Sequence, residues 1–207
     1  ALPIWSVSLA VNHNLTVIPE LIIVKNRSLS TPANVAKCYV YHKNLTQFSS
    51  GGKTYSWSLE LNSTASEDGT GAFNVTDTTI SQFTTGFSLI NTSASNYVAY
   101  LFASVAGISK VGSYTGNGTT QTIDCGFSTG ARFVLIKRTD STGDWYVFDT
   151  ARGMTVLNDP YLLLNSTAAE TATLGAVTTT SVGFAVNFSI LAAINTNAAT
   201  YIYLAIA

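Results

Sequence analysis

The sequence predicts an all-β protein made of two tandem antiparallel β-sandwich units, jelly-roll-like and related by an internal repeat. Three observations lead to this fold class. Five blocks of the first half recur in the same order in the second half, and short β-rich runs alternate with turn residues at regular spacing. Helical periodicity is weak throughout the 207 residues.

The internal repeat is clearest at a six-residue apolar run. Residues 21–26 (LIIVKN) align with residues 133–138 (FVLIKR), and Leu15 aligns with Phe127 at the same separation. The other matching blocks are residues 38–42 with 145–149, 59–65 with 162–168, 86–89 with 183–186, and 97–99 with 201–203. Because the gaps fall only between blocks, we expect two domains, residues 1–107 and 108–207, each of a usual domain size.

Both domains are predicted to consist almost entirely of strands. Residues 21–25 and 133–137 are short apolar runs typical of strands buried on both faces. Residues 145–149 (WYVFD) predict a strand with Trp145 and Val147 on one face and Tyr146 and Phe148 on the other. Further strands are expected at residues 58–61, 86–90, 97–102, 161–164, 182–188 and 200–206, with a short helix near residues 168–172. A small, glycine-rich junction at residues 106–118 opens the second domain.

The composition limits the classes of partner. Charged residues make up 10% of the chain, whereas an ordinary soluble domain has about 25%. Interface cores are depleted of charge, so we expect neighbours in an assembly to cover much of the surface; the alternative is an extracellular β-domain kept soluble by neutral polar groups. The net charge of −1, without a basic cluster, argues against nucleic acid as a partner. No apolar run approaches the ~20 residues of a membrane-spanning helix, so we expect no membrane insertion.

A loop rich in turn residues carries the candidate ligand-binding carboxylates. Asp140 and Asp144 flank the sequence STG, where aspartate side chains usually bond to the backbone of a turn. A glycosidase would instead need two carboxyl groups some 5–10 Å apart across a cleft, and a weak calcium site is a lesser option. The turn interpretation is favoured, and the strands around residues 140–144 predict a hairpin.

Aromatic side chains are the other candidates for ligand binding. Trp145, Tyr146 and Trp57 could offer flat faces to a sugar or to a partner protein. The alternation of Trp145 with Val147 favours a position in the core for this tryptophan. The weak candidate ligand-binding residues are therefore Asp140, Asp144, Trp145, Tyr146 and Trp57.

The remaining reactive residues form no recognisable catalytic or metal-binding pattern. His13, His42 and Cys38 match no known zinc spacing, and no serine lies in a Gly-x-Ser-x-Gly turn. We therefore expect no enzymatic activity, no metal and no cofactor. Cys38 and Cys125 fall outside the repeat pattern, which favours free, buried thiols over a bridge. Lys25 and Lys137 hold the same position in the two halves, at the end of an apolar strand. We expect both lysines to reach solvent.

Several segments closely resemble repeat domains in tail fibre and related proteins of tailed bacteriophages. In the second half these are residues 112–119 (GSYTGNGT), 123–127 (IDCGF), 133–145 (FVLIKRTDSTGDW), 164–170 (LNSTAAE) and 199–207 (ATYIYLAIA). In the first half they are residues 11–15 (VNHNL), 19–27 (PELIIVKNR) and 97–103 (YVAYLFA). The first half departs from the pattern, because residues 3–7 replace the glycine-rich opening, Cys38 replaces the tryptophan and residues 31–37 form an insertion.

The resemblance implies a bacteriophage virion structural protein, foremost a tail fibre or tailspike component that contributes to host attachment. It implies a homotrimer that contacts neighbouring virion proteins and a host surface glycan or protein, located in the tail or on the capsid surface. The alternative is a capsid decoration or cement protein that clamps shell subunits. A function as a glycan-degrading enzyme is the less favoured interpretation.

Overall fold

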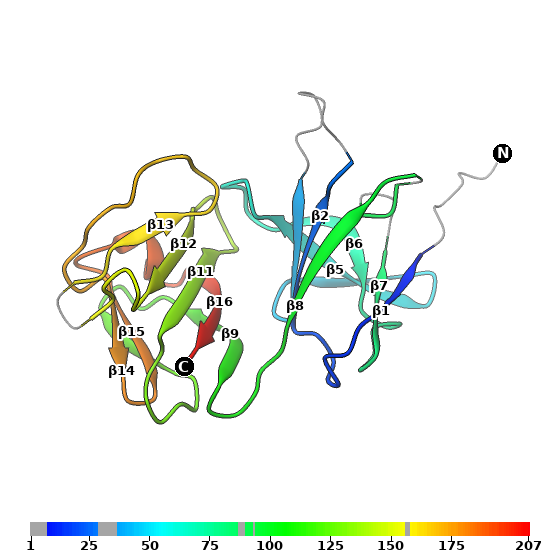
Figure 1. The fold of residues 1–207 in the computed structure, drawn as a ribbon. Helices are drawn as coiled ribbons and strands as arrows, with labels where there is room; N and C mark the ends of the chain where they lie inside the picture. The colour runs from blue at the N-terminus through cyan, green and yellow to red at the C-terminus, as the bar shows by residue number, and fades with distance from the viewer. Residues whose placement is uncertain (1–7, 29–36, 87–89, 93, 156–157) are drawn as a thin grey trace. The chain divides into compact units, whose positions relative to one another are not determined.

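The computed structural model describes residues 8–28, 37–86, 90–92, 94–155 and 158–207. These residues form sixteen strands, all paired antiparallel, and one 3-10 helix, so the all-β class is confirmed (Figure 1). The chain separates into two compact units: unit 1 holds residues 1–61 and 67–103, and unit 2 holds residues 62–66 and 104–207.

Unit 1 is one curled sheet with the strand order β1-β7-β6-β5-β3-β2-β8, to which β4 adds by pairing with β5. Its core contains Ile22 and Val24 from one half of the sheet together with Phe73 and Phe83 from the other half, so the sheet folds over onto itself. The strands are β1 (Ala10–Asn12), β2 (Leu21–Asn26), β3 (Cys38–His42), β4 (Gln47–Ser50), β5 (Lys53–Glu60), β6 (Asp68–Asn74), β7 (Gln82–Thr85) and β8 (Tyr97–Phe102).

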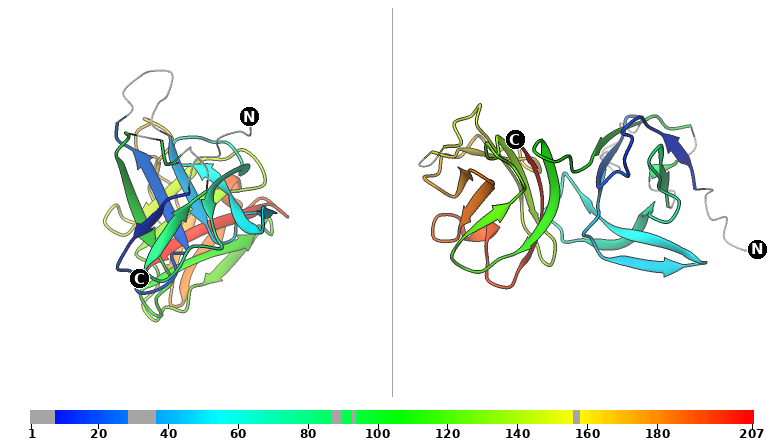
Figure 2. Two further views of the ribbon diagram at one scale, coloured as in Figure 1. Left: turned by 90° about the vertical axis from the view of Figure 1, so that its right-hand side faces the viewer. Right: turned by 90° about the horizontal axis from the view of Figure 1, so that it is seen from below.

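Unit 2 has two sheets with a core between them (Figures 1 and 2). The five-stranded sheet has the order β13-β12-β11-β16-β9, and the three-stranded sheet has the order β10-β15-β14. Ile136 and Phe148 of the first sheet share one apolar cluster with Phe184 and Val186 of the second. The elements are β9 (Ser109–Thr115), β10 (Thr120–Asp124), β11 (Phe133–Arg138), β12 (Trp145–Asp149), β13 (Tyr161–Leu163), β14 (Val177–Thr180), β15 (Gly183–Asn187), the 3-10 helix η3 (Ala192–Ile194) and β16 (Thr200–Ile206).

The two units share an order of strand pairing. In unit 1, β2 lies between β3 and β8, and β7 lies between β1 and β6; in unit 2, β11 lies between β12 and β16, and β15 lies between β10 and β14. Single hydrogen bonds also correspond, since the Leu61 amide donates to the Cys38 carbonyl as the Leu164 amide does to that of Trp145. One difference is that β9 pairs with β16, whereas β8 has β2 as its single strand partner among the described residues.

Most of the expected strands lie where the sequence places them. The strands at residues 97–102, 145–149 and 200–206 have the predicted bounds, and β11 and β12 form the predicted hairpin. The predicted alternation is also confirmed, because Tyr146 and Phe148 belong to the unit 2 core, whereas Trp145 and Val147 are buried on the opposite face of β12.

Three expectations need correction or fall outside the description. Most of the strand expected at residues 86–90 lies outside the described residues; β7 ends at Thr85, and Phe83 pairs with Val11 as Phe184 pairs with Ile123. In the order of strand pairing, residues 82–85 therefore correspond to residues 183–186, whereas the sequence comparison matches residues 86–89 to them. The short helix near residues 168–172 is also wrong, because Thr171 forms a β-bridge with Tyr161 and no helix is described there. Apart from Lys37, the insertion at residues 31–37 lies outside the described residues.

Two glycines form a tight hairpin between β4 and β5 of unit 1. Gly51 and Gly52 link β4 to β5 with φ angles of 58° and 77°. Two consecutive positive φ values suit the right-handed twist of the flanking strands, and glycine adopts them without steric cost. This hairpin pairs Phe48 with Tyr55, whose ring centroids are 5.7 Å apart.

Candidate functional site

The β11–β12 hairpin brings four of the five candidate residues together in unit 2. Asp140, Asp144, Trp145 and Tyr146 lie in the connecting loop and at the start of β12, whereas Trp57 lies on β5 of unit 1 and is half-buried. The hairpin is therefore the place to test whether these groups are available to a ligand.

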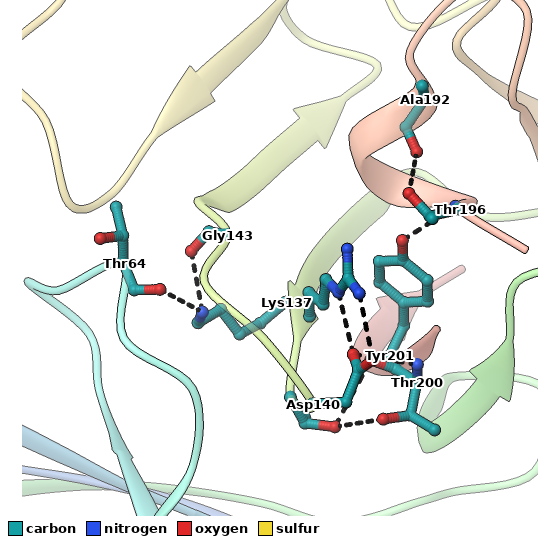
Figure 3. Close-up of polar contacts among 10 residues, drawn as sticks. Thr64, Lys137, Asp140, Gly143, Ala192, Thr196, Thr200 and Tyr201 are labelled. Carbon is teal, nitrogen blue, oxygen red and sulfur yellow. Dashed lines mark hydrogen bonds and ion pairs between the residues drawn. The ribbon is translucent and has the colours of Figure 1, made fainter. Parts of the chain in front are cut away.

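Asp140 closes one side of the loop. Its carboxylate accepts hydrogen bonds from Nε and Nη2 of Arg138 at 2.9 and 3.1 Å and from the amide of Thr200 at 3.2 Å (Figure 3). The Arg138 guanidinium holds the pKa of Asp140 below its usual value, since it bonds to the charged form. This carboxylate therefore joins the loop to the start of β16, 60 positions away in the sequence.

On the other side of the loop, Asp144 is held by Asn165. The Asn165 Nδ2 group donates to Oδ1 of Asp144 at 2.7 Å, and its Oδ1 accepts the Trp145 amide at 2.8 Å. Asn165 follows β13, so its side chain connects the loop to the adjacent edge of the sheet. Both candidate carboxylates therefore hold the hairpin in one conformation.

The aromatic candidates of the hairpin have little exposed surface. Trp145 is 1% exposed, so it is buried as predicted, but it lies on the face of β12 opposite to the core between the two sheets; Tyr146 is 7% exposed. The Tyr146 ring contacts that of Tyr161 edge-on, with centroids 5.3 Å apart. Burial raises the pKa of the Tyr146 hydroxyl, with Asp144 as a further cause. Neither ring offers a free face for stacking on a sugar.

Lys137 contradicts the expectation of a lysine that reaches solvent. Lys25 is exposed as predicted, but Lys137 is fully buried, and its Nζ donates to the carbonyls of Gly143 at 2.8 Å and Thr64 at 3.2 Å (Figure 3). The Thr64 carbonyl also accepts the Gly143 amide at 2.9 Å, so residues 62–66 close over this part of unit 2. Burial lowers the pKa of Lys137 to about 8, because removal of water disfavours the ammonium form.

The Lys137→Met variant is expected to change how stability depends on pH. Between pH 8 and 10.5 the folded wild type binds fewer protons than the unfolded chain, so its free energy of unfolding rises with pH in this window. Relative to the variant, the wild type should gain about 1–2 kcal/mol from pH 7.5 to 9.5. Urea unfolding at several pH values measures this difference. The Lys25→Met variant controls for the loss of one positive charge, and an equal pH profile for all three proteins would contradict the expectation.

The surroundings of the histidines and cysteines suit a structural role. Nδ1 of His13 accepts the Leu15 amide and Nδ1 of His42 accepts the Asn44 amide, so each ring closes a local turn. Within the described ranges, no three His, Cys, Asp or Glu residues are grouped so as to hold a metal ion. Cys38 and Cys125 are not joined in a disulfide bond, and burial raises the pKa of the Cys125 thiol to about 11. Cys38 is only half-buried, in contrast to the expectation.

Two buried polar residues and one cavity were not predicted from the sequence. Asp159 and Asn195 are both fully buried; Asn195 accepts the Asn117 amide and Nε2 of Gln121 at 3.0 and 2.6 Å. An open cavity of about 200 Å³ lies on the three-stranded sheet, lined by Thr120, Leu174, Gly175, Thr178, Ala185, Val186 and Asn187. Its lining carries no charged side chain. The sequence carries no signal for the burial of Asp159 and Asn195, because a polar residue type in a loop does not reveal whether it is buried.

Comparisons with known proteins give a family and no function. No curated protein matches the chain, and no solved structure matches it. Among the described residues, no helix has both the length and the apolar character needed to cross a membrane. One family model, described as a domain of unknown function (DUF7483), matches residues 5–207. Since this match spans nearly the whole sequence, the chain belongs to the DUF7483 family.

Proposed function

We propose that this chain is a non-enzymatic structural protein of a tailed-bacteriophage particle, a tail fibre or tailspike component that contributes to attachment to the host surface. The observation that carries the proposal is the use of polar groups in the β11–β12 hairpin. Its charged residues Lys137, Arg138, Asp140 and Asp144 bond to other groups of the chain. This internal use suits a rigid scaffold, and the resemblance to phage tail fibre repeats supplies the context.

The proposal includes the origin of the architecture. The units are two copies of one jelly-roll-like β-sandwich, arranged in tandem over about residues 1–107 and 108–207. The matching order of strand pairs supports this view, as does one further pair of corresponding bonds: the amides of Thr92 and Thr196 donate to the hydroxyls of Tyr97 and Tyr201, at 2.9 and 3.0 Å. Duplication of a rigid unit is a simple way to lengthen a fibre.

A catalytic role has less support than a structural one. Glycoside hydrolysis needs a proton donor and a second carboxylate that face a substrate. Asp140 bonds to Arg138 and Asp144 bonds to Asn165, so substrate binding would first have to break these contacts. Incubation of host polysaccharide with the purified chain should leave the polymer length unchanged. A loss of length that Asp140→Asn or Asp144→Asn abolishes would overturn the structural assignment.

The location in the particle is tested by gold-labelled antibody on intact particles, with the number of labels counted. Label at the tail end, at a few to some tens of copies, is the expected result, and purified chain should then compete with particles for host cells. Label spread over the head would exclude the tail assignment and favour the capsid decoration protein.

A further inference from the structure

We propose that β8 is a pairing edge of unit 1 and that its partner is β8 of a second copy of this chain. The starting point is the difference between two corresponding edges. The outward backbone groups of β16 bond to β9 in unit 2, with Tyr201 opposite Tyr114 and Tyr203 opposite Gly112. The described part of unit 1 contains no strand in the corresponding position beside β8.

The hydrogen-bond pattern identifies which backbone amides and carbonyls of β8 do not bond to β2. The Arg27 amide donates to the Asn96 carbonyl at 2.7 Å, and in an antiparallel pair every second residue then bonds to the same neighbour. Val98 and Tyr100 therefore bond to β2, whereas the amides and carbonyls of Tyr97, Ala99 and Leu101 point away from it. None of these outward groups has a hydrogen-bond partner within the described ranges.

Among the described residues of unit 1, β8 has none of the usual protections of an exposed strand. Open edges are normally shortened, bulged, covered, or marked by charges or proline, because a free edge recruits further strands. The sequence YVAYLF has no charge, no proline and no glycine, and Tyr100 is 55% exposed. An apolar edge of six residues is therefore stable in solution when another strand pairs with it.

In unit 2, contacts from neighbouring residues protect the outer edge of β9. On the outer side of β9, Val105 exchanges backbone bonds with Ser109, and the Ser104 hydroxyl accepts the Val111 amide at 3.1 Å. Farther along, Nε2 of Gln121 donates to the Thr115 carbonyl at 3.1 Å. These contacts occupy outer groups of Ser109, Val111 and Thr115.

A second copy of β8 is the partner that fits best. The strand is uncharged, so two copies meet without burying an unpaired charge. In a two-fold antiparallel pair centred on Ala99, Tyr97 lies opposite Leu101 of the other copy and the two small Ala99 side chains face each other, which is a self-complementary arrangement. The other open edges are shorter or more polar: β1 and β13 have three residues, β4 and β14 have four, and β10 contains Gln121 and Asp124.

The Tyr100→Lys variant tests the pairing. Tyr100 is exposed, so the change should leave the fold intact, yet it would place two lysines diagonally opposite each other in the pair. Sedimentation of the wild-type chain over a range of concentrations should give a monomer–dimer equilibrium, and the variant should raise the dissociation constant at least tenfold. The matched control is Ile80→Lys, which adds the same charge at a position that is 59% exposed and lies outside β8; it should dimerise as the wild type does.

Amide hydrogen exchange of the same proteins decides which edge is used. In the dimer the amides of Ala99 and Leu101 should exchange slowly, and in Tyr100→Lys they should exchange fast while those of Val98 and Tyr100, or the lysine that replaces it, stay protected. A monomer at every concentration, a trimer as the fibre resemblance implies, or dimerisation that Tyr100→Lys leaves unchanged would each overturn the proposal. Protection of Ala99 and Leu101 in a monomer would also overturn it, because a segment of the same chain would then occupy the edge. None of these outcomes bears on the location of the chain in the particle.

Discussion

Replacing Asp159 by alanine is expected to lower the free energy of unfolding of unit 2 by about 3–5 kcal/mol. The carboxylate of Asp159 is fully buried and accepts hydrogen bonds from the Thr173 hydroxyl and the Val177 amide, both at 2.8 Å, and from the Gly175 amide. The variant leaves these three donors without an acceptor in the interior, and each unsatisfied group costs about 1–3 kcal/mol.

Urea unfolding followed by circular dichroism measures the effect of Asp159→Ala. Asp159→Asn should be intermediate, since the amide retains one acceptor oxygen but presents a donor to the other groups. Glu170→Ala is the control, because Glu170 is exposed and its ion pair with Arg152 has a separation of 3.4 Å; it should change stability by less than about 0.5 kcal/mol. A loss below about 1 kcal/mol for Asp159→Ala would show that the three donors find other acceptors.

Phe184→Ala is expected to lower the free energy of unfolding by a similar amount, about 3–5 kcal/mol. The Phe184 side chain is fully buried between the two sheets of unit 2 and meets the Tyr203 ring edge-on, with centroids 5.3 Å apart. Truncation removes these contacts and leaves a cavity that the paired strands on both sides cannot readily close.

Leu174→Ala is the matched control for Phe184→Ala. Leu174 also belongs to unit 2, but it is 69% exposed, so its truncation should change stability by less than about 0.5 kcal/mol. Thermal unfolding of both variants and the wild type provides the comparison. Equal losses in the two variants would mean that the packing between the sheets contributes little to stability.

The hairpin illustrates how far the sequence predicts the candidate site. The residue types DSTGD give the turn, and the alternation of residues 145–149 correctly separates Trp145 and Val147 from Tyr146 and Phe148, but it does not reveal that the second pair faces the core between the sheets. The bond between Asn165 and Asp144 spans 21 positions of the sequence, and local patterns do not specify such partners. Lys137 shows the same limit. Its place at the end of an apolar strand matches that of Lys25, yet Lys25 is exposed and Lys137 is buried.

The sequence by itself determined the all-β class, the bounds of the central strands and the β11–β12 hairpin, because two-residue alternation and turn chemistry act over a few neighbouring positions. Tertiary structure alone decided which polar groups are buried and which strand edges are paired. The correspondence of residues 82–85 with residues 183–186 belongs to this second group. In the sequence, GFAV at 183–186 resembles GFSL at 86–89 more than QFTT at 82–85, and only the pairing of Phe83 with β1 and of Phe184 with β10 shows which segments correspond. Burial and edge pairing depend on which distant segments of the chain meet. The unpaired edge of β8 is therefore recognised only by comparing it with the corresponding edge of β16, which pairs with β9.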